Sequence, residues 1–428
     1  MSILKFIKRR QMEEKRKLVS IQTIDDIQPI ENADNIEVAL VGGWNIVIRK
    51  GEFKKGDKAF YFEIDSMIPL EDERFSFLES RGKKEQNGIL YHRLKTAKLR
   101  GQISQGLLFP LNIWNKEDGN LEEIEQETNS FADYFKVVKY EEPVKLSGNQ
   151  KLTNWPDSLP KTDEERLQSL VKEWNYEDIL NSGTWIATEK IDGCSITMFC
   201  EYDEENDKPG NLRICSRNFE LVNTEEDPYW KAVNNKKIEQ IGTFGDIEQL
   251  SLEDYMKIKS NKMLDDEDLN IFQISGICLQ GELFGEGIQS NRLGCKGQHI
   301  RFYNLLVKFK NSWIQLPMTK VVRHFPELEK YWVPIHAELS LPENLKDAIS
   351  QPDGVKSIVP EASKDRQIEG IVWRLVDKSY VKNEIIKQID FSKIPEEKWN
   401  LVKEKSTQLE TKKASFKCIS NKYLLKNE

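Results

Sequence analysis

Residues 185–202 read WIATEKIDGCSITMFCEY, and this stretch predicts two short strands, 185–189 and 195–202, on either side of a polar turn. Side chains in the second strand alternate between two faces, with the period of two that is typical of a strand. The turn contains Lys190, Asp192 and Gly193. A lysine beside buried strands needs partners, and burial together with neighbouring cations lowers its pKa until the free amine can attack an electrophile. Taken alone, however, the stretch is better explained by an ordinary hairpin, because Asp-Gly is a frequent turn dipeptide.

Length and composition indicate a folded chain of two domains. At 428 residues the chain is long enough for two separate hydrophobic cores. The formal net charge of −8 excludes a uniformly basic nucleic-acid binder, so a nucleic-acid site must be a local patch. The six cysteines include no CxxC pair and the four histidines lack zinc-ligand spacing, which predicts reduced thiols in an intracellular protein. No run of 18 apolar residues occurs, so no membrane-spanning segment is expected.

The N-terminal part of the chain predicts a small β-barrel. Short apolar runs separated by glycine-containing turns follow one another at 18–24, 36–48, 58–64 and 94–110. Several short strands within about 100 residues indicate a small barrel or sandwich. Our hypothesis is a five-stranded OB-type barrel, a fold that often binds nucleic-acid backbones. We therefore assign residues 1–120 to an OB-type nucleic-acid-binding domain.

A basic cluster lies in the last part of this barrel. It comprises His92, Arg93, Lys95, Lys98 and Arg100, beside Tyr91. Contact with phosphates is one interpretation of the cluster, and an ordinary solvated face is the other. The residues alone support both interpretations equally.

A connector and a second domain are expected after the barrel. Residues 121–160 contain three prolines and little periodicity, which is typical of a connector. At 163–175, acidic residues precede apolar residues at helical spacing, which predicts a helix at the start of a domain that covers 161–428. Residues 223–270 are acidic and are expected to form a helical or looped surface insertion.

Five apolar, strand-like runs of the second domain each carry an ionisable residue. In chain order these residues are Lys190, Arg217, Glu282, Glu369 and Lys417. A single one is most simply a solvated side chain on a half-buried strand, but five in order are hard to explain in that way. If their polar faces converge, the site combines an amine nucleophile with two carboxylates and two further cations. This set suits chemistry on a nucleoside triphosphate, because cations neutralise phosphates while carboxylates hold a divalent metal or a ribose hydroxyl.

The ordered motifs resemble those of the covalent nucleotidyltransferase superfamily, which contains ATP-dependent ligases and capping enzymes. EKIDG, SRNFEL, GELFGEGIQ, RFYNLL, EGIVWR and SFKCISNKYLLK follow one another in the second domain. Together with GDKAFYFEIDSMIP, RLKTAKLRGQISQGLLFPL and KTDEERLQ, they resemble RNA ligases of the Deinococcus/Naegleria type, which have an N-terminal OB domain. The resemblance covers the chain except residues 223–270 and 376–410. It implies an α+β fold, in which an OB-type β-barrel precedes a nucleotidyltransferase (adenylyltransferase) domain built on antiparallel sheets with flanking helices.

The resemblance assigns roles around the nucleotide. Lys190 would be the catalytic nucleophile that forms a lysyl–AMP intermediate, and Glu189 would lie beside the adenine edge. Arg217 would contact the ribose or the phosphates of a nick, and Glu282 would accept a hydrogen bond from a ribose hydroxyl. Arg166 would be a further phosphate contact.

The adenine-stacking residue departs from the family pattern. The expected position in the RFYNLL strand carries Leu305, and the nearest aromatic residues are Phe302 and Tyr303. Phe302 is the nucleotide-binding candidate that we carry forward.

The resemblance also implies a metal and a second catalytic lysine. Asp192 and Glu369 would hold Mg²⁺ or Mn²⁺ through water, and Lys417 would stabilise charge on the α-phosphate. Many members carry another lysine two residues later, where this chain has Ile419, so Lys417 is expected to act alone or with Lys422.

The activity implied is sealing of RNA with ATP as the AMP donor. The expected substrate is a nicked duplex with an RNA 3′-OH strand, and the expected enzyme is an intracellular monomer without an obligate protein partner. An mRNA capping guanylyltransferase or a DNA ligase is the nearest alternative, but their OB domain follows the catalytic domain and only 11 residues follow Lys417 here. An inactive nucleic-acid-binding scaffold is a further alternative, although it would be expected to have lost Lys190, Glu369 or Lys417. A P-loop kinase is excluded because no GxxxxGK[ST] motif occurs.

Overall fold

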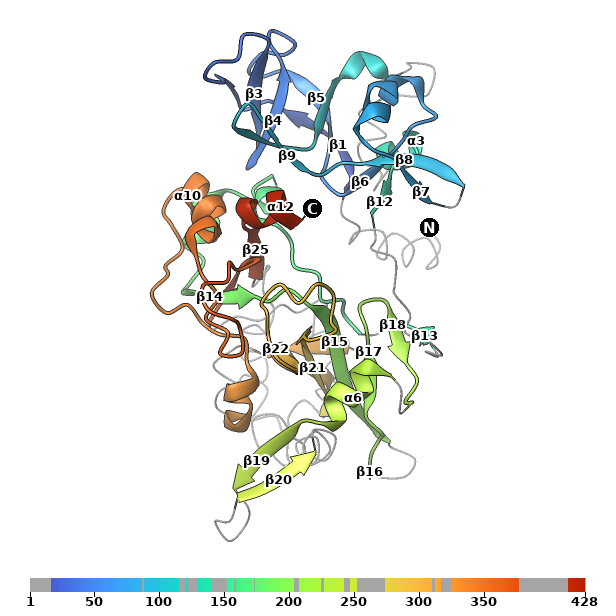
Figure 1. The fold of residues 1–428 in the computed structure, drawn as a ribbon, viewed down its shortest axis with the longest axis vertical. Coiled ribbons are helices and arrows are strands. Elements are labelled where there is room, and N and C mark those ends of the chain that lie inside the picture. The colour runs from blue at the N-terminus through green and yellow to red at the C-terminus, as the bar shows by residue number, and fades with distance from the viewer. Residues whose placement is uncertain are drawn as a thin grey trace, which may run out of the picture. The chain divides into compact units, whose positions relative to one another are not determined.

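Two units make up the chain in its computed structural model (Figure 1). The structure describes residues 17–376 and 415–427, except residues 87, 115–120, 122–129, 141–151, 158, 173, 204–207, 225–226, 242–246, 252–273, 310–311 and 317–324. One unit is Met1–Val144 with Leu424–Glu428, and the other is Lys145–Tyr423. The domain boundaries expected at residues 120 and 160 stay predictions. Much of the expected connector and of the stretches 223–270 and 376–410 lies outside the described residues.

The N-terminal unit consists mainly of short antiparallel strands. Its elements are β1 (Val19–Thr23), β2 (Asp26–Pro29), β3 (Ile36–Val41), β4 (Trp44–Arg49), β5 (Lys58–Phe62), β6 (Ser66–Pro69), η1 (Glu73–Arg81), β7 (Lys84–Gln86), β8 (Ile89–Arg93), β9 (Thr96–Leu99), β10 (Gln102–Gln105), β11 (Leu107–Pro110), η2 (Leu111–Ile113), α3 (Ser130–Tyr134) and β12 (Val138–Lys139). The strands expected within 18–24, 36–48, 58–64 and 94–110 are confirmed.

Strand β5 lies between two hydrophobic cores of this unit. Because side chains alternate along a strand, Phe60 and Phe62 point into one core while Ala59 and Tyr61 point into the other. β5 pairs with β1 on one side and β11 on the other, and the hairpin of β3 and β4 packs its apolar face on the second core. The Tyr61 hydroxyl donates to the Gln105 carbonyl of β10 (3.0 Å), so neighbouring sheets are also joined by hydrogen bonds.

The second unit is built on two antiparallel sheets. The larger has the order β13 (Leu152–Asn154), β18 (Phe219–Leu221), β17 (Arg213–Cys215), β15 (Cys194–Asp203), β21 (Ile274–Gly285), β22 (Gln298–Phe309) and β23 (Ser312–Gln315), with β16 (Lys208–Pro209) beside β15. The smaller has the order β14 (Trp185–Lys190), β24 (Gly370–Leu375) and β25 (Ser415–Ile419). The remaining elements are α4 (Leu167–Leu170), α5 (Tyr176–Leu180), α6 (Pro228–Asn234), β19 (Lys237–Ile241), β20 (Ile247–Ser251), η4 (Pro326–Tyr331), α10 (Leu345–Ser350), η5 (Gln351–Gly354) and α12 (Asn421–Asn427).

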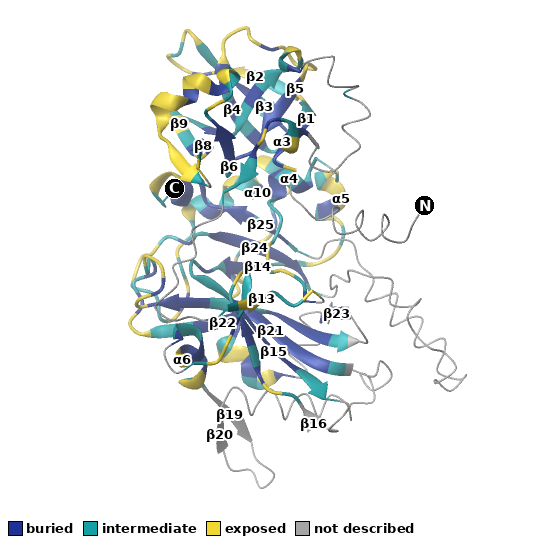
Figure 2. Cartoon of the chain, turned by 90° about the vertical axis from the view of Figure 1, so that its right-hand side faces the viewer, coloured by how far each residue is buried: buried dark blue, intermediate teal, exposed yellow. Residues whose placement is uncertain are grey.

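Both strands of the opening motif form, but they do not pair with each other. β14 pairs with β24 in the smaller sheet, whereas β15 pairs with β17 and β21 in the larger one. The hairpin interpretation of this stretch is therefore wrong. The segment 191–193 instead carries the chain from one sheet to the other, which places Lys190, at the end of β14, where the two sheets meet. Figure 2 shows that the central strands of both sheets are largely buried.

Two further expectations, the helix at 163–175 and the surface position of the stretch 223–270, differ from the structure within the described residues. The helix expected at 163–175 is replaced by α4 and α5, and the residues before Leu167 are extended. The reason is a backbone contact, because the Glu165 carbonyl accepts from the Lys417 amide (2.8 Å) and so ties this segment to β25. In the expected surface insertion, α6 buries Trp230 and Val233 in the core of the larger sheet. Among the described residues, no helix has the length and apolar character needed to cross a membrane.

Candidate active site

Lys190 is the last residue of β14 and lies beside a carboxylate. Its Nζ is 2.7 Å from Glu369 Oε1. Glu369 directly precedes β24, whose first residue, Gly370, is the strand partner of Lys190. Sequence position and strand register therefore bring together two charged residues that are 179 positions apart.

Two further carboxylates surround this pair. Burial, with the nearby charges of Glu369 and Asp192, raises the pKa of the Glu282 carboxyl to about 8, although Lys190 acts in the opposite direction. Burial alone would lower the pKa of Lys190, but the carboxylates of Glu369, Glu282 and Asp192 outweigh it and raise that pKa. The expectation that neighbouring cations depress the lysine pKa is therefore wrong for this state of the protein, because the nearest charges are negative.

Lys417 lies on the same face of the smaller sheet as Lys190. Opposed residues of antiparallel strands share a face, and the row Thr188, Val372 and Lys417 lies two residues from the row that contains Lys190. Arg166 forms a β-bridge with Lys417. The structure thus places Lys190 and Lys417 on one face.

Arg217 lies farther out than the other motif residues. Its guanidinium pairs with Asp163 at 2.9 Å, and its side chain is 59% exposed. It nevertheless acts on Glu282, since its charge favours the ionised form of that carboxyl and opposes the rise in pKa. An exposed arginine at the edge of the cluster is accessible to a large substrate.

Glu189 is buried beside the nucleophile and points away from it. Its carboxylate accepts from the Ser357 hydroxyl (2.5 Å) and from the Ile358 amide (2.9 Å). His336 Nε2 lies 3.4 Å from the same carboxylate. These contacts hold the segment around residue 358 against β14.

Phe302 and Tyr303 occupy opposite faces of the larger sheet. Phe302 is fully buried in the hydrophobic core, opposite Gly281, where an added Cβ would lie 2.9 Å from its ring. Tyr303 is the next residue and points to the other face, where its hydroxyl bonds Thr162 and Ser195; it is the extra, unpaired residue at a register shift between Gln280 and Gly281. Only Tyr303 of the two aromatic residues therefore lies on the face that carries Glu282.

Asp192 has partners that the motifs did not reveal. Arg292 Nη1 lies 3.2 Å from both carboxylate oxygens of Asp192 and also donates to the Tyr423 hydroxyl. The Tyr423 hydroxyl itself bonds Asp192. Arg292 follows the GELFGEGIQ motif, whereas Tyr423 lies inside SFKCISNKYLLK, and neither residue was assigned a role from the sequence.

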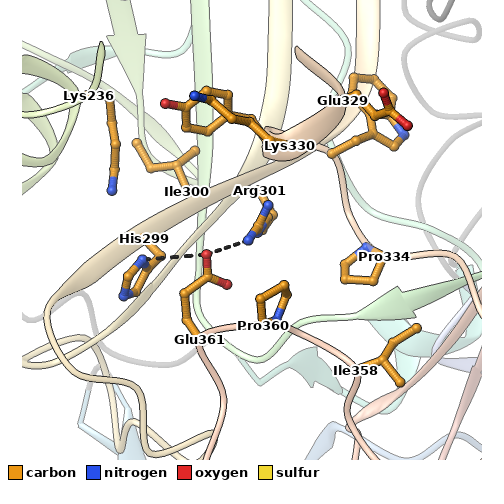
Figure 3. Close-up of a pocket in the computed structure, with 12 residues that line it drawn as sticks. Lys236, His299, Ile300, Arg301, Glu329, Lys330, Pro334, Ile358, Pro360 and Glu361 are labelled. Carbon is orange, nitrogen blue, oxygen red and sulfur yellow. Dashed lines mark hydrogen bonds and ion pairs between the residues drawn. The ribbon is translucent and has the colours of Figure 1, made fainter. Parts of the chain in front are cut away.

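A cavity of about 590 Å³ lies in the second unit (Figure 3), and its wall contains Arg301, the strand partner of Glu282. Apolar side chains and prolines form part of its wall, together with a carboxylate, Glu361, that is paired with Arg301 and lies 3.9 Å from His299. Ile358, whose amide bonds Glu189, is also in the wall. The lining residues are Lys236, His299, Ile300, Arg301, Glu329, Lys330, Tyr331, Trp332, Pro334, Ile358, Pro360 and Glu361.

The basic cluster of the N-terminal unit is divided by the structure. Arg93 pairs with Asp65 at 2.6 Å and stacks on the Tyr140 ring, so its charge is already engaged within the unit. Lys95, Lys98 and Arg100 are exposed, and Arg100 lies in the two-residue turn that joins β9 and β10. The geometry leaves the last three accessible to a partner.

A divalent metal fits the donor chemistry of the cluster. Carboxylate oxygens are hard ligands of the kind that Mg²⁺ and Mn²⁺ prefer, and Mg²⁺ keeps several waters when one or two carboxylates bind it. Within the described residues, no group of three or more His, Cys, Asp or Glu side chains could hold a metal directly. Asp192, Glu282 and Glu369 therefore suit a hydrated cation rather than a fully protein-bound one.

Comparisons with known proteins agree with this geometry. Residues 18–111 match the model of an OB-fold domain, and residues 183–389 match the RNA ligase family model. Solved structures of Naegleria gruberi RNA ligase each cover 96% of this chain, and the chain covers 99% of each. A point variant with AMP and Mn is 28% identical with a TM-score of 0.68, the enzyme with PPi is 27% identical with 0.66, and a point variant with ATP and Mn is 29% identical with 0.66. No curated protein sequence matches significantly.

The fold and these matches define the class as nucleotidyltransferases of the ligase type. Within that class the chain resembles the ATP-dependent RNA ligases with an N-terminal OB-fold domain, and the predicted enzyme class, an ATP-dependent RNA ligase, is confirmed. A nucleic acid is therefore its substrate.

Proposed function

We propose that Lys190 attacks the α-phosphorus of ATP and carries the AMP as a phosphoramidate before it is passed to an RNA end. The single observation that carries this proposal is the position of Lys190, at the junction of the two sheets, 2.7 Å from Glu369 and on the same face as Lys417. A lysine is a nucleophile only as the free amine, so a neighbouring group must take its proton. Glu369 Oε1 is the nearest acceptor.

The other residues of the site bind the nucleotide and the nucleic acid or stabilise charge. Lys417 offsets charge on the α-phosphate as the bond to pyrophosphate breaks, which is electrostatic stabilisation of the transition state. Glu282 accepts from a ribose hydroxyl, and Arg217, at the exposed edge, contacts the phosphates of the substrate. Asp192 and Glu369 would hold a hydrated Mg²⁺ or Mn²⁺, which would supply positive charge beside the phosphates. Arg292 keeps the Asp192 carboxylate in place.

The substrate we propose is a nick in a duplex with an RNA 3′-OH strand. The adenylylated 5′-phosphate is attacked by the 3′-OH, AMP leaves, and a phosphodiester forms. Lys95, Lys98 and Arg100 of the N-terminal unit are exposed and suit contact with the phosphates of the duplex. All six cysteines are free thiols, which supports an intracellular location. We further propose that the enzyme acts as a monomer.

The test is covalent labelling with α-labelled ATP and Mg²⁺ or Mn²⁺. The wild type should form a labelled adduct that survives denaturation, and Lys190→Ala should form none. The matched control is Lys346→Ala, since Lys346 is an exposed lysine of α10 in the same unit. Labelling of Lys190→Ala at the wild-type level would overturn the assignment, and preferential labelling by GTP would favour the guanylyltransferase alternative.

A further inference from the structure

The segment 420–423, which directly follows β25, contacts both carboxylate residues that were assigned to the cation. We call it the 420–423 strap. At one end the Ser420 amide donates to the Glu369 carbonyl (2.9 Å), and at the other end the Tyr423 hydroxyl bonds Asp192. Ser420 and Tyr423 are both buried, at 0% and 8% exposed. The strap therefore joins the two residues of the proposed metal site from the side of the last strand.

Asp353 of η5 holds the strap in place. Its Oδ1 accepts from the Ser420 hydroxyl (2.9 Å) and from the Lys422 amide (3.1 Å). The Ser420 hydroxyl in turn accepts from the Tyr423 amide (3.2 Å), which is the contact that an N-cap residue makes with the first turn of its helix, here α12. Because these bonds fix the backbone on both sides of that turn, the Tyr423 ring is held beside Asp192.

Arg292, Tyr423 and Asp192 form a closed set of hydrogen bonds. Arg292 Nη1 donates to the Tyr423 hydroxyl and lies 3.2 Å from both carboxylate oxygens of Asp192. A hydroxyl has a single proton, and since the Tyr423 oxygen accepts from Arg292, that proton is directed to Asp192. An ionised carboxylate has about four lone-pair sites, so these two donors leave capacity for a water of a hydrated cation. The Asp192 side chain is 11% exposed, which gives such a water access.

We propose that Tyr423 is a positioning residue, whose hydroxyl sets the affinity of the site for a hydrated Mg²⁺ or Mn²⁺. The hydroxyl takes up one N–H of Arg292 Nη1 and so limits the hold of the guanidinium on the Asp192 carboxylate. Without the hydroxyl, that N–H turns to the carboxylate and competes with the waters of the cation. The inference rests on the proposed function, because that proposal assigns Asp192 and Glu369 to the cation. It adds the residue that orients Asp192 for this task.

The test is Tyr423→Phe, which removes the hydroxyl and keeps the ring. Binding of Mn²⁺ to the full-length enzyme saturated with α,β-methylene-ATP, whose α–β bridge is not cleaved, is measured from water proton relaxation. Groups that orient a metal-holding residue contribute about 10- to 100-fold to metal affinity, so the variant should bind Mn²⁺ at least about tenfold more weakly. The half-saturating Mn²⁺ concentration for adduct formation with ATP should rise by the same factor. The rate at saturating Mn²⁺ should stay near the wild-type rate.

Tyr176→Phe is the matched control. Tyr176 lies on α5 in the same unit, and its hydroxyl donates to the Pro342 carbonyl (2.5 Å). This variant also loses one hydroxyl and one hydrogen bond, so it should keep the wild-type Mn²⁺ affinity even if its melting temperature falls. Asp353→Ala is a second variant, which loosens the strap without changing Tyr423, and it should weaken Mn²⁺ binding in the same direction.

The outcomes separate this inference from the proposed function. Wild-type Mn²⁺ affinity and half-saturation in Tyr423→Phe overturn the inference, and so does an equal loss of affinity in Tyr176→Phe. If Tyr423→Phe does not fold, Asp353→Ala decides the matter with the same two measurements. If the wild type forms an adduct at Lys190, the proposed function stands whichever affinities the variants show. If it forms no adduct at any Mn²⁺ concentration, the proposed function itself fails.

Discussion

Replacement of Gly193 by alanine should disturb the junction between the two sheets. A Cβ at this position would lie 2.4 Å from the Leu283 carbonyl oxygen, 2.9 Å from Phe284 Cβ and 3.0 Å from Glu282 Cγ. Optimal separations of heavy atoms are about 3.5–4.0 Å, so the turn and β21 would have to part by roughly 1 Å. Leu283 is paired with strands on both sides, so its carbonyl cannot swing away.

The cost follows from this overlap. Overpacking in a well-filled interior destabilises by about 1–3 kcal/mol, and a displacement of about 1 Å near the reacting atoms lowers rates by about 100-fold. We therefore expect Gly193→Ala to lose about 1–3 kcal/mol of unfolding free energy for the second unit and to form the labelled adduct about 100-fold more slowly. Urea unfolding followed by tryptophan fluorescence gives the first quantity, and single-turnover labelling with α-labelled ATP gives the second.

Gly354 provides the matched control. An added Cβ there would meet no atom within 4 Å, and Gly354 has no positive φ. Gly354→Ala should therefore lower the free energy of unfolding by no more than about 0.5 kcal/mol. It should leave the labelling rate unchanged. Wild-type stability and labelling in Gly193→Ala would refute the reasoning, since the close approach of this turn to β21 would then be unimportant.

Two further predictions concern the N-terminal unit and pH. Deletion of residues 1–120 should spare self-adenylylation, measured as labelled adduct, but weaken nick sealing, measured as joined product. Loss of both activities would show a structural role for the N-terminal unit instead. Burial lowers the pKa of His336, but the carboxylates of Glu189 and Glu338 outweigh it and raise that pKa above its usual ~6.5. The stabilisation from the charged imidazole is thus complete below about pH 6.5 and is lost as the pH rises through the raised value. His336→Asn should therefore lower the melting temperature more at pH 6 than at pH 9, and an equal loss at both would contradict this account.

Strand positions could be predicted from the sequence more readily than strand partners. The alternation in residues 195–202 identified β15 because one side of that strand packs on a core, and Ile196, Met198 and Cys200 are buried there. The same pattern says nothing about pairing, so the hairpin remained the simplest interpretation of Lys190 to Gly193. Pairing depends on contacts such as Ile371 opposite Glu189, which come from residues about 180 positions away.

The helix at 163–175 was overpredicted for a related reason. Acidic residues followed by apolar residues at helical spacing are a local signal, and that signal is real from Leu167 onward. The preceding residues are extended because the Glu165 carbonyl accepts a hydrogen bond from Lys417, which lies some 250 residues later in the chain. A long-range backbone contact therefore overrides the local preference.

The candidate site was predictable where residues lie inside recognisable motifs. Lys190, Glu282 and Glu369 come together as expected. Arg292 was not found, because it lies outside the quoted motifs. Its contact with both carboxylate oxygens of Asp192 is a property of the folded chain.

The charge state of Lys190 shows most clearly what motif order leaves undetermined. The motifs supply both further cations, which lower the pKa of Lys190, and carboxylates, which raise it. The distance of each charge from Lys190 Nζ decides whether that pKa rises or falls. Register places Lys417 on β25, two strands from β14 and two residues along the sheet from the Lys190 row, which is about 10 Å across the strands and about 7 Å along them at the usual spacing and rise. Glu369 directly precedes the strand partner of Lys190 and comes within 2.7 Å. Because Coulomb energy falls with distance, the carboxylates dominate and the lysine is held as an ammonium ion. The charge on the nucleophile thus follows from strand register, so shifting β24 by one residue would change it without altering any motif.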